Sequence, residues 1–321
     1  MNKSEGKAGW AGETGGRLQT LDLVRGLTII SMVLYHGMWD FFYLSRFSEG
    51  MRISFRWYQG MGGHLWQQSI CRSFILLVGF CVPLSKNIIR RGLLVSACGI
   101  LVSAVTIFAA YEERVLLGVL TFHGAAMLLA GAVRQLGAGR RLWKTNESVN
   151  TEASADQRQS AGHSLQKHSL QKRGTRPNRH AGGRLCGREP VRPGAGALVC
   201  VFMFHITRWV NRGYLQLGPA LRLALPSVLY NREGAAGWIL TALGFPMKDF
   251  FSTDYFSLFP WIFLFQTGIS LYRMLEDRKA LSRPVFHLQM PLVNWIGQHS
   301  LLIYLIHQPL LYLLVSVINC L

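Results

Sequence analysis

The chain has 321 residues, of which 50% are hydrophobic and 16% are charged, and its mean hydropathy is +0.22. This composition excludes an ordinary water-soluble domain, and several apolar runs approach the roughly 20 residues that span a bilayer as a helix. The net charge of +18 would indicate a nucleic-acid partner in a soluble protein. Because the lysines and arginines gather in alternate loops, the charge instead indicates the cytoplasmic loops of a membrane protein. We expect an all-α, polytopic transmembrane helix bundle with membrane lipids, and no nucleic acid, as partners.

Residues 1–20 are polar and rich in glycine, which predicts a disordered N-terminal tail without a cleavable signal peptide. A single transmembrane domain is expected over residues 21–321. Pro309 is expected to kink its last helix or to free a backbone carbonyl there. Hydrophobic periodicity predicts about seven helices, over residues 22–43, 65–85, 92–111, 115–134, 194–210, 254–273 and 293–319.

Basic loops follow the second, fourth and sixth predicted helices. Since successive spans alternate in direction, these loops and the N-terminus lie on one side of the membrane. The bias of lysine and arginine assigns that side to the cytoplasm and places the C-terminus outside. We expect the protein in the plasma membrane.

Two connections between helices are unusual in composition. Residues 137–193 are strongly basic and poor in apolar side chains, which predicts a disordered cytoplasmic loop that interrupts the domain. This loop either binds anionic lipid or is an unselected insertion. Residues 211–253 are rich in aromatic residues, glycine and proline, and form either a cover over an outward-facing cavity or an interfacial aromatic belt.

The first predicted helix carries a polar stripe made of Asp22, Arg25, His36 and Asp40. At ~100° per residue, Arg25 and His36 lie within about 20° of each other around the helix axis. Asp40 is one turn beyond His36 on the same side. Ionisable groups inside a membrane span are costly and mark functional candidates, so this stripe indicates a site that runs from a charged end to a deep histidine.

The last predicted helix carries a second polar stripe. His307 lies ~20 Å along this helix, and His36 lies ~21 Å along the first helix, so both are expected at similar depth. His123 is expected near the same level. Histidine is the commonest general base, so these residues could form one proton-handling site, or each could satisfy a local hydrogen bond between helices. The second stripe comprises Ser300, Tyr304, His307 and Gln308.

Other polar residues allow two interpretations each, one structural and one functional. Asp22 and Arg25 form either a simple ion pair at the cytoplasmic interface or a site where Arg25, helped by Arg90 and Arg91, holds a phosphate-bearing donor. Asp254 either caps the helix 254–273 or orients a histidine. The six cysteines lack the spacing of a zinc site, and we expect buried free thiols and no metal.

Five segments of the chain resemble a bacterial membrane family related to heparan-alpha-glucosaminide N-acetyltransferase. The first and the last are the most specific, and the first is also similar to the broader integral-membrane acyltransferases. In chain order the segments are LDLVRGLTIISMVLYHGMWDFFYL, FILLVGFCVPLS, GVLTFHGAAMLL, STDYFSLFPWIFLFQTGISLYR and WIGQHSLLIYLIHQPLL.

The resemblance implies transfer of an acyl group, acetyl above all, from cytosolic acetyl-CoA to an amine or hydroxyl of a glycan or glycolipid. In that reading His36, assisted by Asp40, is the base, and His307 is a second base or an oxyanion donor. Asp254 would support these catalytic residues. Asp22 and Arg25 would bind the donor with help from Arg90 and Arg91, and Ser300, Tyr304 and Gln308 would bind the acceptor. Of these residues, Asp22, Arg25, Ser300 and Gln308 match the family pattern.

One departure from the family pattern concerns the fourth predicted helix. Many relatives have GILH or GVLH there, whereas this chain has GVLT, with Thr121 in place of the histidine and His123 two residues later. The departure puts a role for His123 in doubt. Two other classes stay open on the sequence alone, namely a proton-coupled transporter or flippase and a structural or degraded member of the family.

Overall fold

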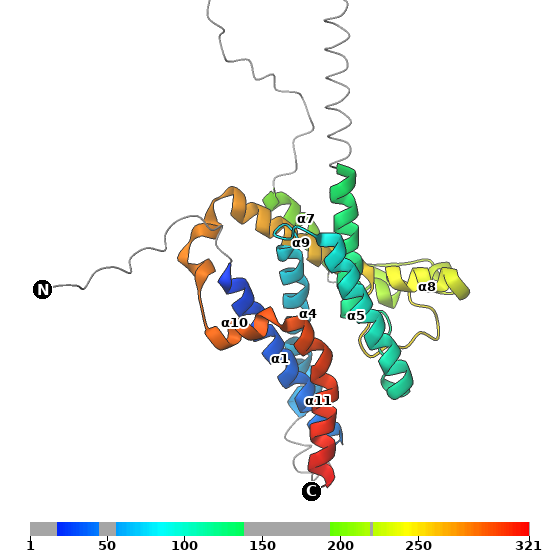
Figure 1. The fold of residues 1–321 in the computed structure, drawn as a ribbon. Coiled ribbons are helices and arrows are strands. Elements are labelled where there is room, and N and C mark those ends of the chain that lie inside the picture. Colours follow the sequence, from blue (N-terminus) through cyan, green and yellow to red (C-terminus); the bar gives the residue numbers. More distant parts are fainter. Residues whose placement is uncertain (1–17, 45–55, 138–192, 219–220, 321) are drawn as a thin grey trace, which may run out of the picture.

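The computed structural model describes residues 18–44, 56–137, 193–218 and 221–320, and this part of the chain is predominantly helical (Figure 1). Two of its helices, α4 (Met61–Cys81) and α9 (Leu258–Asp277), have 21 and 20 residues and so reach the length of a span, but they carry more polar residues. Five other helices of the described residues are long and apolar enough to cross a membrane, so the prediction of an all-α polytopic membrane protein is confirmed. The described helices that are long and apolar enough to cross a membrane are Gln19–Phe42 of α1 (Gln19–Leu44), α5 (Ile88–Ala109), Val119–Gly137, Pro193–Arg212 with α7 (Pro193–Thr207), and Ser300–Ile318 of α11 (Ser300–Cys320).

The prediction of one continuous helix over residues 293–319 is wrong. This stretch forms α10 (Pro291–Gln298) and α11, with His299 between them at φ −98° and ψ 17°. The carbonyl of His299 accepts the N–H of Ile303 and so begins α11, which continues through Pro309. The apolar pattern runs across the break because both helices pack against α1, so periodicity alone does not reveal it.

The bundle is held together by close contacts between helix backbones. The helix α9 packs along α4 and α7, while α1 packs against α10, α11 and α4. Glycines allow the closest approaches, because a Cβ at Gly79 would overlap the carbonyl of Phe265, and a Cβ at Gly297 would overlap that of Asp22. Small residues play this part where helices associate inside a membrane.

Two hydrophobic clusters form the interior. The larger one joins α4, α7, α9 and the helix Val119–Gly137 around Phe265 and Ile75, and the smaller one lies between α1 and α4 around Ile29 and Ile70. The side chain of Tyr304 on α11 packs against both clusters. It therefore links the two halves of the interior.

The connection 211–253 contains secondary structure that the sequence pattern did not predict. Its strands β1 (Tyr214–Gln216) and β2 (Arg222–Ala224) pair antiparallel, and α8 (Gly234–Leu243) follows. Gly213, at φ 87°, provides the left-handed turn that leads into β1. The short elements of the described chain are α3 (Arg56–Gln59), η1 (Tyr111–Glu113), η2 (Val210–Arg212), η3 (Ser227–Leu229), η4 (Ala280–Ser282) and η5 (Pro284–His287).

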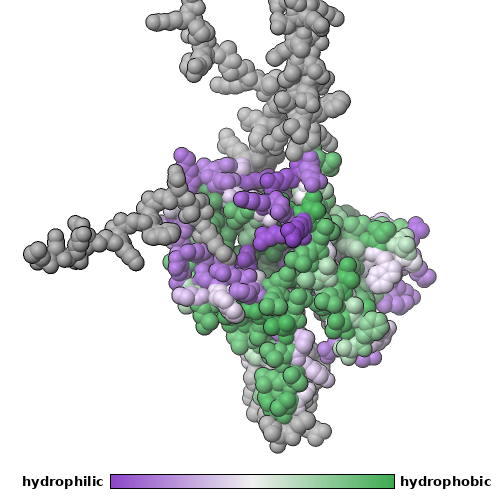
Figure 2. Space-filling model, in the orientation of Figure 1, coloured by the Kyte–Doolittle hydropathy of each residue, from purple (hydrophilic) through white to green (hydrophobic). Residues whose placement is uncertain are grey.

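The two ends of the bundle differ in polarity. Figure 1 places the start of α1, the turn between α4 and α5, and the end of α9 in its upper part, with the C-terminus at the bottom. Figure 2 shows hydrophilic residues gathered in the same upper part and a hydrophobic surface below. We call this upper part, made of residues 19–25, 82–91 and 273–283, the basic end. Residues 1–17 of the predicted disordered tail (1–20) and residues 138–192 of the predicted basic loop (137–193) lie outside the described residues.

Candidate functional site

Two of the predicted histidines lie next to each other between α1 and α11. The ring centroids of His36 and His307 are 5.2 Å apart, with an angle of 58° between the ring planes. His307 is buried, and His36 is largely enclosed. The rise per residue of an α-helix, which predicts equal depth for these two residues, also explains why packing of the two helices in the same direction brings the rings together.

The hydrogen bond of His307 fixes the role of its other ring nitrogen. Its Nδ1 lies 2.7 Å from the carbonyl oxygen of Tyr304. A carbonyl only accepts, so Nδ1 carries the proton and donates, which leaves Nε2 of the neutral ring with a free lone pair. This Nε2 atom is buried and has no hydrogen-bond partner among the described residues. It is therefore positioned to accept a proton from a bound molecule.

Asp40 contacts α11 one turn beyond the histidine pair. The side-chain amide of Gln308 donates to both carboxylate oxygens of Asp40, each at 3.1 Å. The predicted assistance of His36 by Asp40 is therefore not seen in the described hydrogen bonds, because the carboxylate is occupied by Gln308. The bond also sets the orientation of the amide, since its oxygen would be repelled by a carboxylate. The Oε1 atom of Gln308 is left buried and without a partner within the described part of the chain.

An aromatic wall borders the histidine pair on the side of α3 and α4. Tyr58 is buried and donates its hydroxyl to the carbonyl of Tyr35, at 3.0 Å. Trp66 meets the ring of Tyr35 edge-on and donates to the hydroxyl of Ser31, at 2.7 Å. Sequence reasoning missed Tyr58 and Trp66, although the aromatic-rich run RWYQGMGGHLW is a visible signal. These rings limit the space beside His36.

Asp254 caps a different helix from the one that the sequence predicts. The helix α9 begins only at Leu258, and the carboxylate of Asp254 instead accepts the N–H of Val119, at 3.2 Å, at the start of the helix Val119–Gly137. An N-terminal carboxylate suits the helix dipole there. Burial raises the pKa of Asp254 to about 6, against the hydrogen bond from Val119, which lowers it. Asp254 also interacts electrostatically with Tyr304, which places it near the α11 stripe.

His123 is not part of the histidine pair. It is buried on the helix Val119–Gly137, and its ring contacts that of Phe122, with 5.6 Å between centroids. No hydrogen bond or ring contact joins it to His36 or His307 in the described residues. Of the three histidines predicted at one level, the structure thus brings two together.

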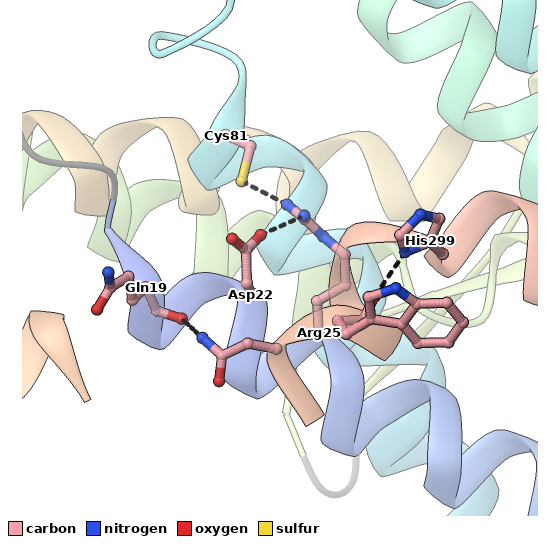
Figure 3. Close-up of polar contacts among 7 residues, drawn as sticks. Gln19, Asp22, Arg25, Cys81 and His299 are labelled. Carbon is pink, nitrogen blue, oxygen red and sulfur yellow. Dashed lines mark hydrogen bonds and ion pairs between the residues drawn. The ribbon is translucent and has the colours of Figure 1, made fainter. Parts of the chain in front are cut away.

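Arg25 lies at the basic end, between α1 and α4. Its guanidinium donates to the Asp22 carboxylate at 3.1 Å and to the sulfur of Cys81 at 3.1 Å (Figure 3). The side chain of Arg25 is 25% exposed. The predicted i, i+3 pair is therefore present, and the contact with Cys81 adds a link to α4.

Further guanidinium groups surround the turn that follows α4. Arg91 donates to the hydroxyl of Ser85 at 3.5 Å, and Arg134 donates to the carbonyl of Ser85 at 3.3 Å. Arg91 also acts electrostatically on Cys81, the partner of Arg25. Arg90 is exposed beside them. Sequence reasoning missed Arg134, because nothing in the pattern indicates which turn the end of its helix meets.

The remaining predicted residues, Ser300 and Tyr304, lie on α11 between the basic end and the histidine pair. Ser300 begins this helix, about 6 Å from Tyr304 along the axis, and its hydroxyl makes no hydrogen bond within the described residues. Among the described residues, no group of His, Cys, Asp and Glu side chains lies together in a way that could hold a metal ion. The arrangement is thus a stripe of polar groups between the basic end and the histidine pair.

A known protein family matches most of the chain. The family model described as "Heparan-alpha-glucosaminide N-acetyltransferase, catalytic" matches residues 17–144 and 195–309. These ranges contain the histidine pair, the bond between Asp40 and Gln308, and the arginines of the basic end. No curated protein and no solved structure matches the chain at the significance required.

Proposed function

The chain belongs to the family of the heparan-alpha-glucosaminide N-acetyltransferase catalytic domain, and from that premise we propose that it transfers an acetyl group from acetyl-CoA to an amine or hydroxyl of a glycan or glycolipid. The coarser description, a membrane acetyltransferase-like protein, already follows from the family and the helices. The donor, the acceptor and the plasma membrane as location are our proposals.

The observation that carries the proposal is a pair of buried acceptor atoms that find no hydrogen-bond partner within the described residues. Nε2 of His307 and Oε1 of Gln308 belong to adjacent residues whose side chains both meet α1. Unpaired buried polar atoms are costly, so such a site favours a ligand that brings hydrogen-bond donors. Sugar hydroxyls and amines are donors of this kind, and each carries the proton that must leave when it is acylated.

The chemistry assigns distinct parts to these groups. Nε2 of His307 accepts the proton of the acceptor O–H or N–H while the oxygen or nitrogen attacks the thioester carbonyl. The new C–O or C–N bond replaces the C–S bond, and the proton finally resides on the departing thiol. His36, beside His307, contacts the same reacting atoms as a second base or as an oxyanion donor. Asp40 holds Gln308 in the orientation that receives the acceptor.

The residues of the basic end fit the donor. Guanidinium groups bind phosphate in a bidentate way, and Arg25, Arg91 and Arg134 gather around one turn with Arg90 beside them. Arg25 and His36 are eleven residues apart on α1, which corresponds to about 16 Å along the helix. The proposed donor would supply the activated acetyl group, and its phosphates would be held at the basic end.

The experiment is transfer of labelled acetyl from acetyl-CoA by the protein in nanodiscs, with amino sugars and hydroxyl-bearing glycans as acceptors. We expect His307→Gln to lower kcat by about 10²- to 10⁴-fold, as for loss of a general base. The exposed residue His205 on α7 provides the matched control, and His205→Gln is expected to leave the rate unchanged. Full activity in both His36→Gln and His307→Gln would contradict the assignment. Flux of a sugar across vesicles without any acyl donor would favour a transporter instead.

A further inference from the structure

Arg72 is a charged residue in the middle of a helix of the bundle. It lies eleven residues after Met61, the first residue of α4, which is about 16 Å along that helix. A charge at such a depth is costly, and arginines there are normally paired with a carboxylate or with backbone carbonyls. The contacts of Arg72 therefore show whether its charge is satisfied inside the protein.

The contacts of Arg72 are weak. One guanidinium nitrogen lies 3.4 Å from the amide oxygen of Gln68, and the group lies 5.9 Å from the centre of the Phe204 ring. The Nε atom is buried and has no hydrogen-bond partner among the described residues. No ion pair of Arg72 with a carboxylate occurs in that part of the chain either. Much of the donor capacity of this guanidinium is thus unused.

A second arginine approaches the first from α7. Arg208 directly follows the last residue of α7, Thr207, and repels Arg72 electrostatically. Arg208 and Arg212 both lie against the ring of Trp209, at 5.2 and 4.4 Å. This end of α7 lies on the predicted outer side, where the distribution of lysine and arginine disfavours positive charge. Neither arginine pairs with a carboxylate among the described residues, so these two neighbouring cations favour an anion from outside the chain.

We propose that Arg72 and Arg208 together bind a phosphate group between α4 and α7. A guanidinium fork matches phosphate with two parallel hydrogen bonds, and the unpaired Nε of Arg72 belongs to such a fork. The phosphate can belong to a lipid headgroup or to a free phosphate compound. This site uses neither histidine of the pair, and its test does not depend on acetyl transfer.

The test measures binding directly and compares the two sources of phosphate. The protein in an uncharged detergent is titrated with phosphatidic acid, with diacylglycerol of the same acyl chains, and with inorganic pyrophosphate, and bound ligand is measured by native mass spectrometry. Binding of phosphatidic acid alone assigns a lipid headgroup. Binding of pyrophosphate with equal or greater affinity assigns a free phosphate ligand. Equal binding of phosphatidic acid and diacylglycerol, without pyrophosphate, overturns the proposal.

Variants separate this site from general attraction to a protein of charge +18. We expect Arg72→Gln and Arg208→Gln each to weaken binding about tenfold or more, as for loss of hydrogen bonds to a charged group. Arg232→Gln removes the same charge from an exposed outer position and is expected to bind as the unmodified protein does. If Arg72→Gln does not fold, Arg208→Gln at the end of α7 provides the result. Affinity in Arg208→Gln equal to that of Arg232→Gln overturns the proposal.

Discussion

The contact between α1 and α10 gives a sharp test of the packing at the basic end. A Cβ at Gly26 would lie 2.9 Å from the carbonyl carbon of Val293 and nearer still to its oxygen. Real side chains do not approach a backbone this closely, and a carbonyl cannot rotate away as a flexible side chain can. Gly26→Ala therefore forces α1 and α10 apart.

The expected magnitude follows from two opposing effects. Overpacking of a close contact costs about 1–3 kcal/mol, and backbone against backbone lies at the upper end. Replacing glycine by alanine inside a helix returns up to about 1 kcal/mol. The free energy of unfolding should thus fall by about 2 kcal/mol, which is a large share of the stability of a typical protein.

Gly37 on the same helix is the matched control. A Cβ at this position would lie 3.4 Å from a methyl group of Leu311, which is an ordinary contact. Gly37→Ala should leave the free energy of unfolding unchanged or raise it by up to about 1 kcal/mol. Titration of the solubilised protein with SDS, followed by tryptophan fluorescence, measures both variants. Equal unfolding midpoints for the two variants would refute the close packing of α1 on α10.

Three further outcomes are expected. Gln308→Glu places a second carboxylate against Asp40. The free energy of unfolding in the same SDS titration should fall by about 1.5–3 kcal/mol, as for a lost hydrogen bond to a charged group. An unchanged midpoint would mean that the bond is not formed. Since the pKa of Asp254 is raised to about 6, its stabilising contribution is full below about pH 4 and is lost as the pH rises through 6. Asp254→Asn keeps an acceptor for Val119 and should flatten that part of the stability profile, and a profile unchanged from the unmodified protein would rule the titration out. Arg25→Gln should raise KM for acetyl-CoA about tenfold with a smaller change in kcat, and initial rates that show the reverse would remove Arg25 from the donor site.

Most helix positions could be predicted from the sequence, because they depend on apolar length, whereas the break at His299 could not. The fixed rise per residue predicts that His36 and His307 lie at one level, where their rings indeed meet. Rotation about the helix axis is not set by depth. The sequence therefore could not show that the carboxylate of Asp40 contacts Gln308 rather than His36.

Contacts between segments that are distant in the chain could not be predicted from the sequence either. The sequence leaves open whether Asp254 caps its own helix or orients a histidine, and the structure instead pairs it with Val119, 135 residues away. The choice depends on how the segment before α9 lies against the start of another helix, and no local pattern encodes that. The break at His299 also depends on a distant contact, because the backbone of Gly297 in α10 packs against that of Asp22. No proline marks this break in the sequence.

Tyr304 has a consequence for substitutions made far from the histidines. Its ring packs against both hydrophobic clusters, and its carbonyl is the partner that sets the proton position of His307. Changes in the volume of side chains on α9 or α4 therefore press on the backbone that supports the proposed base. Screens for altered acceptor preference should accordingly recover variants in the interior of the bundle as well as beside the polar stripe, and these variants should trade heat tolerance against turnover.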